Sequence, residues 1–265
     1  MISLKNLIKN TYSNVANSSK ECVCDQSCDT ENKALKIGYS SAEIAEIPID
    51  ANLGLSCGNP LAFSCLSEGE TVLDLGSGAG FDSFLAASKV KSSGKVIGVD
   101  FSQAMVDKAN LIAKQRNILN TEFICADIEE LPIKNETIDI VISNCVLNLI
   151  SNKSKVYNEV YRTLKNGGRM YISDVALLKT IPNGLKSKLE NQSACLQSNI
   201  TVKEYEQLLL KAGFKNIKIN FQKITSCFTE DSNDPFGVTI GKLFKQASLN
   251  VDDFIVSIKI EAFKN

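Results

Sequence analysis

The chain has 265 residues, 44% of them hydrophobic, and a formal net charge of −1. This length holds one large domain, or one domain with a smaller appendage. The composition excludes a disordered chain and a nucleic-acid binder driven by bulk positive charge. The first residues lack the apolar core of a signal peptide, and no apolar run approaches membrane-spanning length. We therefore expect a cytoplasmic protein that binds neither nucleic acid nor a membrane.

The chain contains no histidine and nine cysteines. The lack of histidine removes the commonest general base and metal ligand. In a cytoplasmic protein, cysteines are expected to be free thiols, metal ligands or redox-active groups rather than structural disulfides. Residues 1–37 predict a helix followed by a mobile segment that carries Cys22, Cys24 and Cys28.

A glycine-rich loop follows the buried strand predicted at 71–75 and precedes a helix predicted at 81–90. Its glycines are Gly76, Gly78 and Gly80, a G-x-G-x-G spacing that differs from the dinucleotide pattern G-x-G-x-x-G and favours a nucleoside without a pyrophosphate. Asp100 closes the next strand, where a carboxylate can accept hydrogen bonds from ribose hydroxyls. The loop and this acid together resemble the S-adenosylmethionine site of class I methyltransferases.

Strands and helices alternate between residues 71 and 174, which predicts a parallel sheet with helices on both faces. Beyond residue 175, Thr201 and Glu204 form a capping box that opens a helix ending at Gly213. Strand-like runs at 216–224 and 254–262 predict a small C-terminal sheet, with 235–237 as a turn. We expect an α/β, Rossmann-like class I methyltransferase fold with a mainly parallel sheet and a small C-terminal α+β appendage. The expected parts are 1–37, the cofactor-binding domain at 38–175, and a substrate-binding region and C-terminal domain at 176–265.

Three cysteines lie where a parallel-sheet enzyme keeps its active site. Cys145 follows a predicted strand at the carboxyl edge of the sheet, Cys57 lies in a turn-rich loop, and Cys195 lies in a region expected to cover that edge. Their spacing is not that of a zinc ribbon and favours a convergent three-thiolate site for a soft ion. Cys65 and Cys125 stand in apolar runs and are expected to be buried as small hydrophobic residues.

The chain from about Gly38 to its end closely resembles the arsenite methyltransferases, which act in arsenic detoxification. The most specific segments are Cys57-Gly58-Asn59-Pro60 and Ser143-Asn144-Cys145-Val146-Leu147-Asn148-Leu149. The resemblance implies that Cys57, Cys145 and Cys195 bind trivalent arsenic and that S-adenosylmethionine supplies the methyl group. It also implies a thiol reductant, glutathione or a thioredoxin-like protein, as co-substrate. The residues after Cys195 depart from the family, which usually has small residues there, often paired glycines.

The expected cofactor contacts divide along the pocket, with Asp74 near the methionine end, Asp100 on the ribose and Asp127 near the adenine. The full set of predicted cofactor-binding residues is Asp74, Gly76, Ser77, Gly78, Gly80, Asp100, Phe101, Ala126, Asp127, Ile128 and Asn144. Two alternatives stay open: a class I methyltransferase that acts on a small organic molecule, and a thiolate protein that binds metalloids without turnover.

Overall fold

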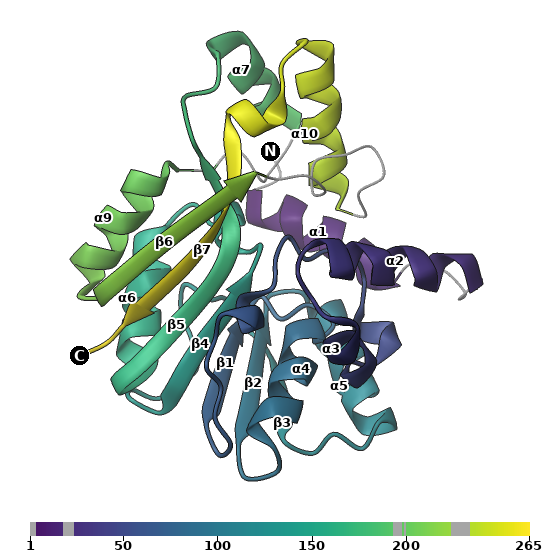
Figure 1. The fold of residues 1–265 in the computed structure, drawn as a ribbon, viewed down its shortest axis with the longest axis vertical. Helices are drawn as coiled ribbons and strands as arrows, with labels where there is room; N and C mark the ends of the chain where they lie inside the picture. The colour runs from purple at the N-terminus through teal and green to yellow at the C-terminus, as the bar shows by residue number, and fades with distance from the viewer. Residues whose placement is uncertain (1–3, 18–23, 193–197, 199, 224–233) are drawn as a thin grey trace.

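The central feature of the fold is one seven-stranded sheet in the order β3-β2-β1-β4-β5-β7-β6 (Figure 1). The computed structural model describes residues 4–17, 24–192, 198, 200–223 and 234–265. The strands are β1 (Thr71–Leu75), β2 (Lys95–Asp100), β3 (Thr121–Cys125), β4 (Ile138–Asn144), β5 (Leu164–Leu177), β6 (Lys215–Lys223) and β7 (Ile255–Phe263). Strands β1 to β5 pair in parallel, whereas β7 runs antiparallel between β5 and β6. All parallel strands therefore end at the same edge of the sheet.

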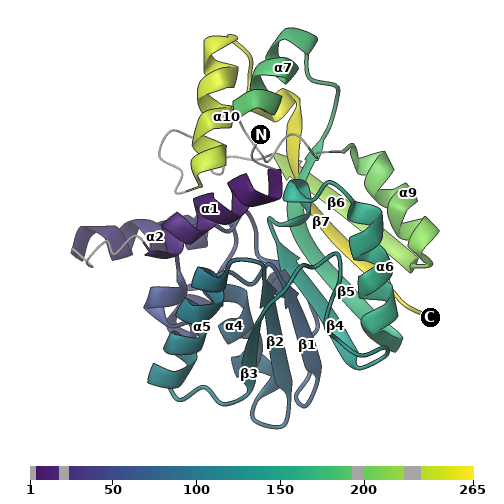
Figure 2. The same ribbon diagram turned by 180° about the vertical axis from the view of Figure 1, so that it is seen from behind.

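Helices cover both faces of the sheet (Figures 1 and 2). On one face, α4 (Phe81–Val90) and α5 (Gln103–Gln115) pack against the side chains of Val72, Val96 and Ile140. On the other, α6 (Lys153–Thr163) and α9 (Val202–Ala212) pack against residues that include Leu73 and Val141. Because consecutive strand residues point to opposite faces, continuous apolar runs such as that of β1 fill both cores.

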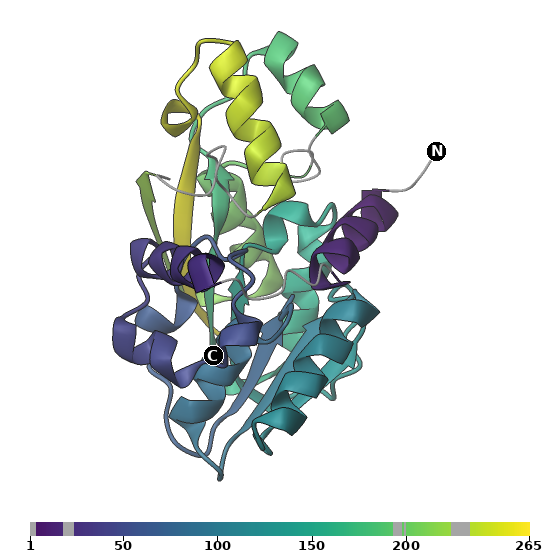
Figure 3. The ribbon, with the colours of Figure 1, turned by 90° about the vertical axis from the view of Figure 1, so that its right-hand side faces the viewer.

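A third layer lies above the carboxyl edge of the sheet. It contains α1 (Leu4–Asn17), α7 (Asn183–Gln192) and α10 (Pro235–Gln246), and Figure 3 shows α7 and α10 side by side at the top of the molecule. Their buried residues, among them Ile8, Leu185 and Ile240, share one apolar cluster with Cys57. Helices α2 (Cys24–Lys36) and α3 (Ser41–Glu46) follow α1 in the chain, and Ala34 of α2 and Ile44 of α3 pack into the cluster that contains α4. In the described part of the chain, no helix combines the length and apolarity that crossing a bilayer requires.

The structure confirms the alternating strands and helices between residues 71 and 174. It also confirms the predicted start and end of α9: Thr201 and Glu204 form the capping box, and Gly213 is the left-handed C-cap. The α/β class with a mostly parallel sheet is likewise as expected.

Two expectations for the termini are wrong. The strands β6 and β7 do not form a separate C-terminal sheet but extend the main one, so the sheet continues across residue 175. Residues 235–237 are not a turn but the first turn of α10, because Asp234 caps the helix with its carboxylate and Pro235 suits the first helical position.

Residues 24–36 form α2, whereas the sequence predicts a mobile segment there. The two lysines of its last turn, Lys33 and Lys36, stabilise a helix through the macrodipole, and Ala34 packs into the cluster beneath α4. Cys22 lies outside the described residues.

Candidate active site

A pocket opens at the carboxyl edge of the sheet, between the glycine loop after β1, the ends of β2 and β4, and the helix α1. In open α/β sheets this edge is where ligands bind. The predicted cofactor residues that line it are Asp74, Gly76, Ser77, Gly78, Asp100, Phe101, Asp127, Ile128 and Asn144. Gly80 and Ala126 do not line it. Gly80 caps α4, and a Cβ there would lie 2.7 Å from the Phe84 ring and 2.9 Å from the Phe123 ring.

Three buried carboxylates face this pocket. Burial and the nearby charge of Asp82 together raise the pKa of Asp74 to about 8, against a 2.6 Å hydrogen bond from the Ser83 hydroxyl, which lowers it. Burial also raises the pKa of Asp82 to about 6, although Tyr39 and Asn144 donate hydrogen bonds to it. A cation in the pocket would stabilise the ionised forms of these acids.

The third carboxylate, Asp100, is held by the backbone at the end of β2. It accepts hydrogen bonds from the N–H groups of Gly78 at 3.0 Å and Ser102 at 2.8 Å. Burial raises the pKa of Asp100, whereas these backbone donors lower it. The acid therefore has a fixed orientation beside the glycine loop, which suits it to accept hydrogen bonds from a ligand's hydroxyl groups.

The glycine loop itself has room for a ligand. A Cβ on Gly78, whose φ is +53°, would meet no atom within 4 Å, and the buried Ser77 hydroxyl has no partner among the described residues. By contrast, a Cβ on Gly76 would lie 2.3 Å from the Val146 side chain. Gly76 thus allows close packing, whereas the space above Gly78, with the carboxylates around it, fits a cationic nucleoside.

Helix α1 contributes Lys5, Ile8 and Tyr12 to the pocket lining. The Lys5 ammonium forms ion pairs with Asp127 at 2.7 Å and Glu129 at 2.9 Å. Partial burial raises the pKa of Asp127, but the hydrogen bonds from Lys5 and from the Glu129 N–H, with the charge of Lys5, lower it overall. The expected adenine contact, Asp127, is therefore already ion-paired with α1.

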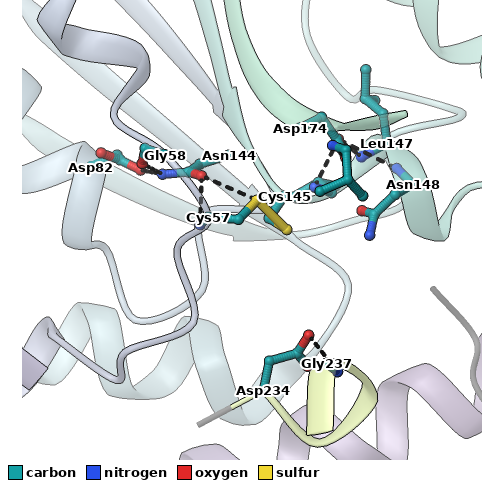
Figure 4. The surroundings of a disulfide bond; sticks show 12 residues. Cys57, Gly58, Asp82, Asn144, Cys145, Leu147, Asn148, Asp174, Asp234 and Gly237 are labelled. Carbon is teal, nitrogen blue, oxygen red and sulfur yellow. Dashed lines mark hydrogen bonds between the residues drawn. A yellow bond between two sulfur atoms is a disulfide. The ribbon is translucent and has the colours of Figure 1, made fainter. Parts of the chain in front are cut away.

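Cys57 and Cys145 form a disulfide across a sequence separation of 88 residues, with 5.8 Å between their Cα atoms (Figure 4). This differs from the expectation that the cysteines are not disulfide-bonded. Cys145 lines the pocket, while Cys57 lies behind it and is buried. The sulfur atoms of Cys57 and Cys145, both predicted as site residues, are thus bonded to each other at the wall of the pocket. Cys195, the third, lies outside the described residues.

Asn144 connects the cysteines to the acids. Its amide nitrogen donates to the Gly58 carbonyl at 2.7 Å and to Asp82 at 2.9 Å, and its carbonyl oxygen accepts from the Cys57 N–H at 3.3 Å. Gly58 lies so close to β5 that a Cβ there would stand 1.9 Å from the Ser173 hydroxyl. These contacts fix the Cys57 loop against the end of β4.

Two other cysteines differ from expectation. Cys65 and Cys125 are both exposed free thiols rather than buried hydrophobic residues. Cys125 ends β3, which is the edge strand of the sheet and has only one neighbouring strand to cover it. Neither residue lines the pocket.

Sequence reasoning missed Asp82, Tyr39 and the whole contribution of α1. A signal for Asp82 was present, since it lies in the first turn of the helix after the glycine loop, where an acid faces the ligand side. Tyr39 donates a 2.6 Å hydrogen bond to it from 43 residues away, a pairing without any local signature. The ion pairs of Lys5 likewise have no local signature in the sequence.

Comparison with known proteins shows the family to which the chain belongs. Residues 66–213 match the family model described as a methyltransferase domain. Arsenite methyltransferase from Halobacterium salinarum is 35% identical over 98% of this chain and 66% of its own length. The corresponding enzyme from Aquipseudomonas alcaligenes is 29% identical over 80% of this chain and 62% of its own. The chain thus spans about two thirds or less of these curated relatives.

Among solved structures, an arsenic(III) S-adenosylmethionine methyltransferase from Chlamydomonas reinhardtii superposes with a TM-score of 0.65 at 29% identity. The match covers 89% of this chain and 73% of that one. A phosphoethanolamine N-methyltransferase from Haemonchus contortus, at 22% identity and a TM-score of 0.60, shares the fold.

The fold and the pocket define a class I methyltransferase, a class whose methyl donor is S-adenosylmethionine, and the chain belongs to the methyltransferase domain family. Within that class, the arsenite methyltransferase from Halobacterium salinarum is similar to it along nearly its whole length.

Proposed function

We propose that this protein transfers methyl groups from S-adenosylmethionine to trivalent arsenic, first to arsenite and then to methylarsenite. The observation that carries the proposal is the meeting of Cys57 and Cys145 at the wall of the acid-lined pocket. Thiolates are the ligands that soft, thiophilic ions prefer, and a small organic substrate would have no need of a thiol pair there. The similarity to arsenite methyltransferases supports the same substrate.

Each group of residues has a defined part in this reaction. When bound, S-adenosylmethionine supplies an electrophilic methyl group. Asp74, Asp82 and Asp100 would hold the cationic nucleoside, with Asp100 on its ribose. Cys57 and Cys145, with Cys195, would hold the arsenic atom by its sulfur bonds and leave its lone pair free. The lone pair is itself the nucleophile, so no general base is needed in a chain without histidine. Because the lone pair becomes the new As–C bond, the transfer leaves the arsenic as As(V), and two electrons from a thiol reductant must return it to As(III) before a second methyl transfer.

The disulfide has a chemical consequence for this function. Arsenite can bind to Cys57 and Cys145 only as thiolates, so the disulfide must first be reduced by two electrons. We therefore include a thiol reductant, glutathione or a thioredoxin-like protein, as a co-substrate in the proposal.

The decisive experiment combines arsenite, glutathione and S-adenosylmethionine with the protein and identifies the methylated arsenic products. Cys145→Ser should abolish product formation while cofactor binding, measured by calorimetry, is unchanged. Cys65→Ser, which removes an exposed thiol that does not line the pocket, is the matched control and should keep its activity. No methylated arsenic from the unmodified protein would refute the proposal.

A second test follows from valence. Arsenite has three positions that sulfur can occupy, whereas methylarsenite has two. If Cys145 and Cys195 form the lasting pair and Cys57 is the third ligand, Cys57→Ser should lose methylation of arsenite far more than methylation of methylarsenite. Product analysis with each substrate alone measures this difference, and equal losses would assign Cys57 another role.

A further inference from the structure

A buried pair of opposite charges lies directly behind the Cys145 loop. Asp174, in β5, has no exposed surface, and Lys153, the first residue of α6, is 3% exposed. Burial lowers the pKa of Lys153 to about 8 and raises that of Asp174 to about 6, while the charge of each opposes the shift of the other. Neither residue lines the cofactor pocket, and burying two charges is costly unless hydrogen bonds compensate.

The carboxylate of Asp174 accepts hydrogen bonds from the backbone of the residues that follow Cys145. One oxygen accepts hydrogen bonds from the N–H groups of Val146 at 3.2 Å, Leu147 at 2.7 Å and Asn148 at 3.3 Å, and Figure 4 shows this arrangement beside the disulfide. The other oxygen accepts from the N–H of Val175 at 2.7 Å. The acid thus holds the whole first turn that follows the cysteine.

This support matters because Cys145 has an unfavourable backbone conformation. Its φ is +59°, in the left-handed region that costs a residue with a Cβ roughly 1–2 kcal/mol. Such a conformation persists only where surrounding contacts enforce it. Here the Cys145 N–H is bonded to the Ser173 carbonyl at 2.8 Å and the next three N–H groups are bonded to Asp174.

Lys153 fixes the other end of the same loop. Its ammonium donates to the Ile150 carbonyl at 2.8 Å and also to the Ser198 carbonyl. In the sequence, Ser198 is three residues beyond Cys195. A lysine in the first turn of a helix is unfavourable for the macrodipole, so helix stability does not explain this position.

We propose that Asp174 and Lys153 are positioning residues for the thiol site. Asp174 sets the conformation that brings Cys145 next to Cys57, and Lys153 ties the end of this loop to the segment that follows Cys195. The effect on arsenic binding rests on the proposed function, whereas the effect on the two cysteines does not.

Two variants test the proposal, and each has a control at the opposite edge of the sheet, where β4 and β5 begin. Asp174→Asn removes the charged acceptor, and Lys153→Met removes the donor while keeping an unbranched buried chain. The controls are Asp139→Asn and Lys165→Met. Asp139 likewise accepts a backbone N–H, from Thr71, and pairs with Lys165.

The first readout needs no arsenic. In glutathione buffers, the equilibrium between reduced and disulfide-bonded Cys57 and Cys145 is measured by mass spectrometry. Losing hydrogen bonds to a charged group should lower the equilibrium constant for the disulfide by about ten-fold or more in both variants. The controls should stay within about two-fold of the unmodified protein.

The second readout is kinetic. Both variants should raise the KM for arsenite by about ten-fold, with the Kd for S-adenosylmethionine changed less than about two-fold. Folded variants that keep the original disulfide equilibrium would overturn the proposal, and if Asp174→Asn does not fold, Lys153→Met decides alone. If the unmodified protein methylates no arsenic but the disulfide equilibrium shifts as expected, the positioning role stands and only the proposed function fails.

Discussion

At the scale of single residues, Asp100 links the ligand pocket to the loop that shapes it. Its carboxylate orients the Gly78 N–H and is positioned to accept the ribose hydroxyls. Asp100→Ala should therefore weaken S-adenosylmethionine binding by about 1.5–3 kcal/mol, the range for a hydrogen bond to a charged group. Calorimetry on the folded variant measures this, and an unchanged affinity would remove Asp100 from the site.

Asp74 gives a prediction about pH. Its pKa is about 8 in the folded protein and near 4 when unfolded, so between these values the folded state binds more protons. The free energy of unfolding of the ligand-free protein should therefore fall as the pH rises through this window. Asp74→Asn should remove that fall and be more stable than the unmodified protein at pH 8 by at least about 1 kcal/mol.

Urea unfolding at pH 5.5 and pH 8 measures the difference, and the same variant should bind the cationic cofactor more weakly at both values. Asp107→Asn, on the exposed side of α5, is the control and should leave both quantities unchanged. Equal pH dependence in Asp74→Asn and the unmodified protein would show that Asp74 ionises normally.

The residues that sequence reasoning found at the pocket are those with a local signature. The glycine loop and the strand-end acid Asp100 follow from spacing along one stretch of chain. Asn144 was expected at the cofactor, but its bonds to the Cys57 loop and to Asp82 join residues up to 87 apart. Such pairings depend on tertiary structure, and no spacing rule reveals them.

At the scale of elements, α1 is a helix that completes the pocket through side chains. Its Lys5 holds Asp127 and Glu129, and its Tyr12 donates a hydrogen bond to Asp234 at the start of α10. Lys5→Met should speed the release of S-adenosylmethionine by a few-fold, because exposed ion pairs contribute at most about 1 kcal/mol.

Stopped-flow displacement of the cofactor measures this rate. Lys9→Met, which changes an exposed lysine one turn further along α1, should leave it unchanged. If both variants release the cofactor at the original rate, the ion pairs of Lys5 do not retain the ligand.

The elements also show where pattern reading succeeds. Helix α9 was predicted at both ends because its capping box and its terminal glycine are local signals. Helix α10 was missed, although Asp234 and Pro235 are a helix start, because the Pro-Phe-Gly sequence is equally typical of a turn. Its apolar residues Phe236, Ile240 and Phe244 are spaced by four, and this helical spacing was the signal that distinguishes a helix from a turn here.

At the scale of the whole molecule, we expect the disulfide to increase stability and to prevent activity on arsenite. It closes a loop of 88 residues, and cross-links of this length stabilise a fold by about 2–5 kcal/mol. The oxidised protein should therefore have the higher Tm and no methylating activity on arsenite. The reduced protein should have the lower Tm and should methylate arsenite. Calorimetric melting and product analysis before and after reduction check this, and an oxidised form that still methylates arsenite would contradict it.

During synthesis, α1 has to wait for contact partners that lie much later in the chain. Helix α1 meets its ion-pair partner Asp127 122 residues later in the chain, and it meets Asp234, at the start of α10, 222 residues later. Strand β7, which fills the place between β5 and β6, arrives later still. In a nascent chain, the glycine loop and the segments of Cys57 and Cys145 therefore emerge well before β7, and we expect full cofactor binding only after residues 255–263 have emerged.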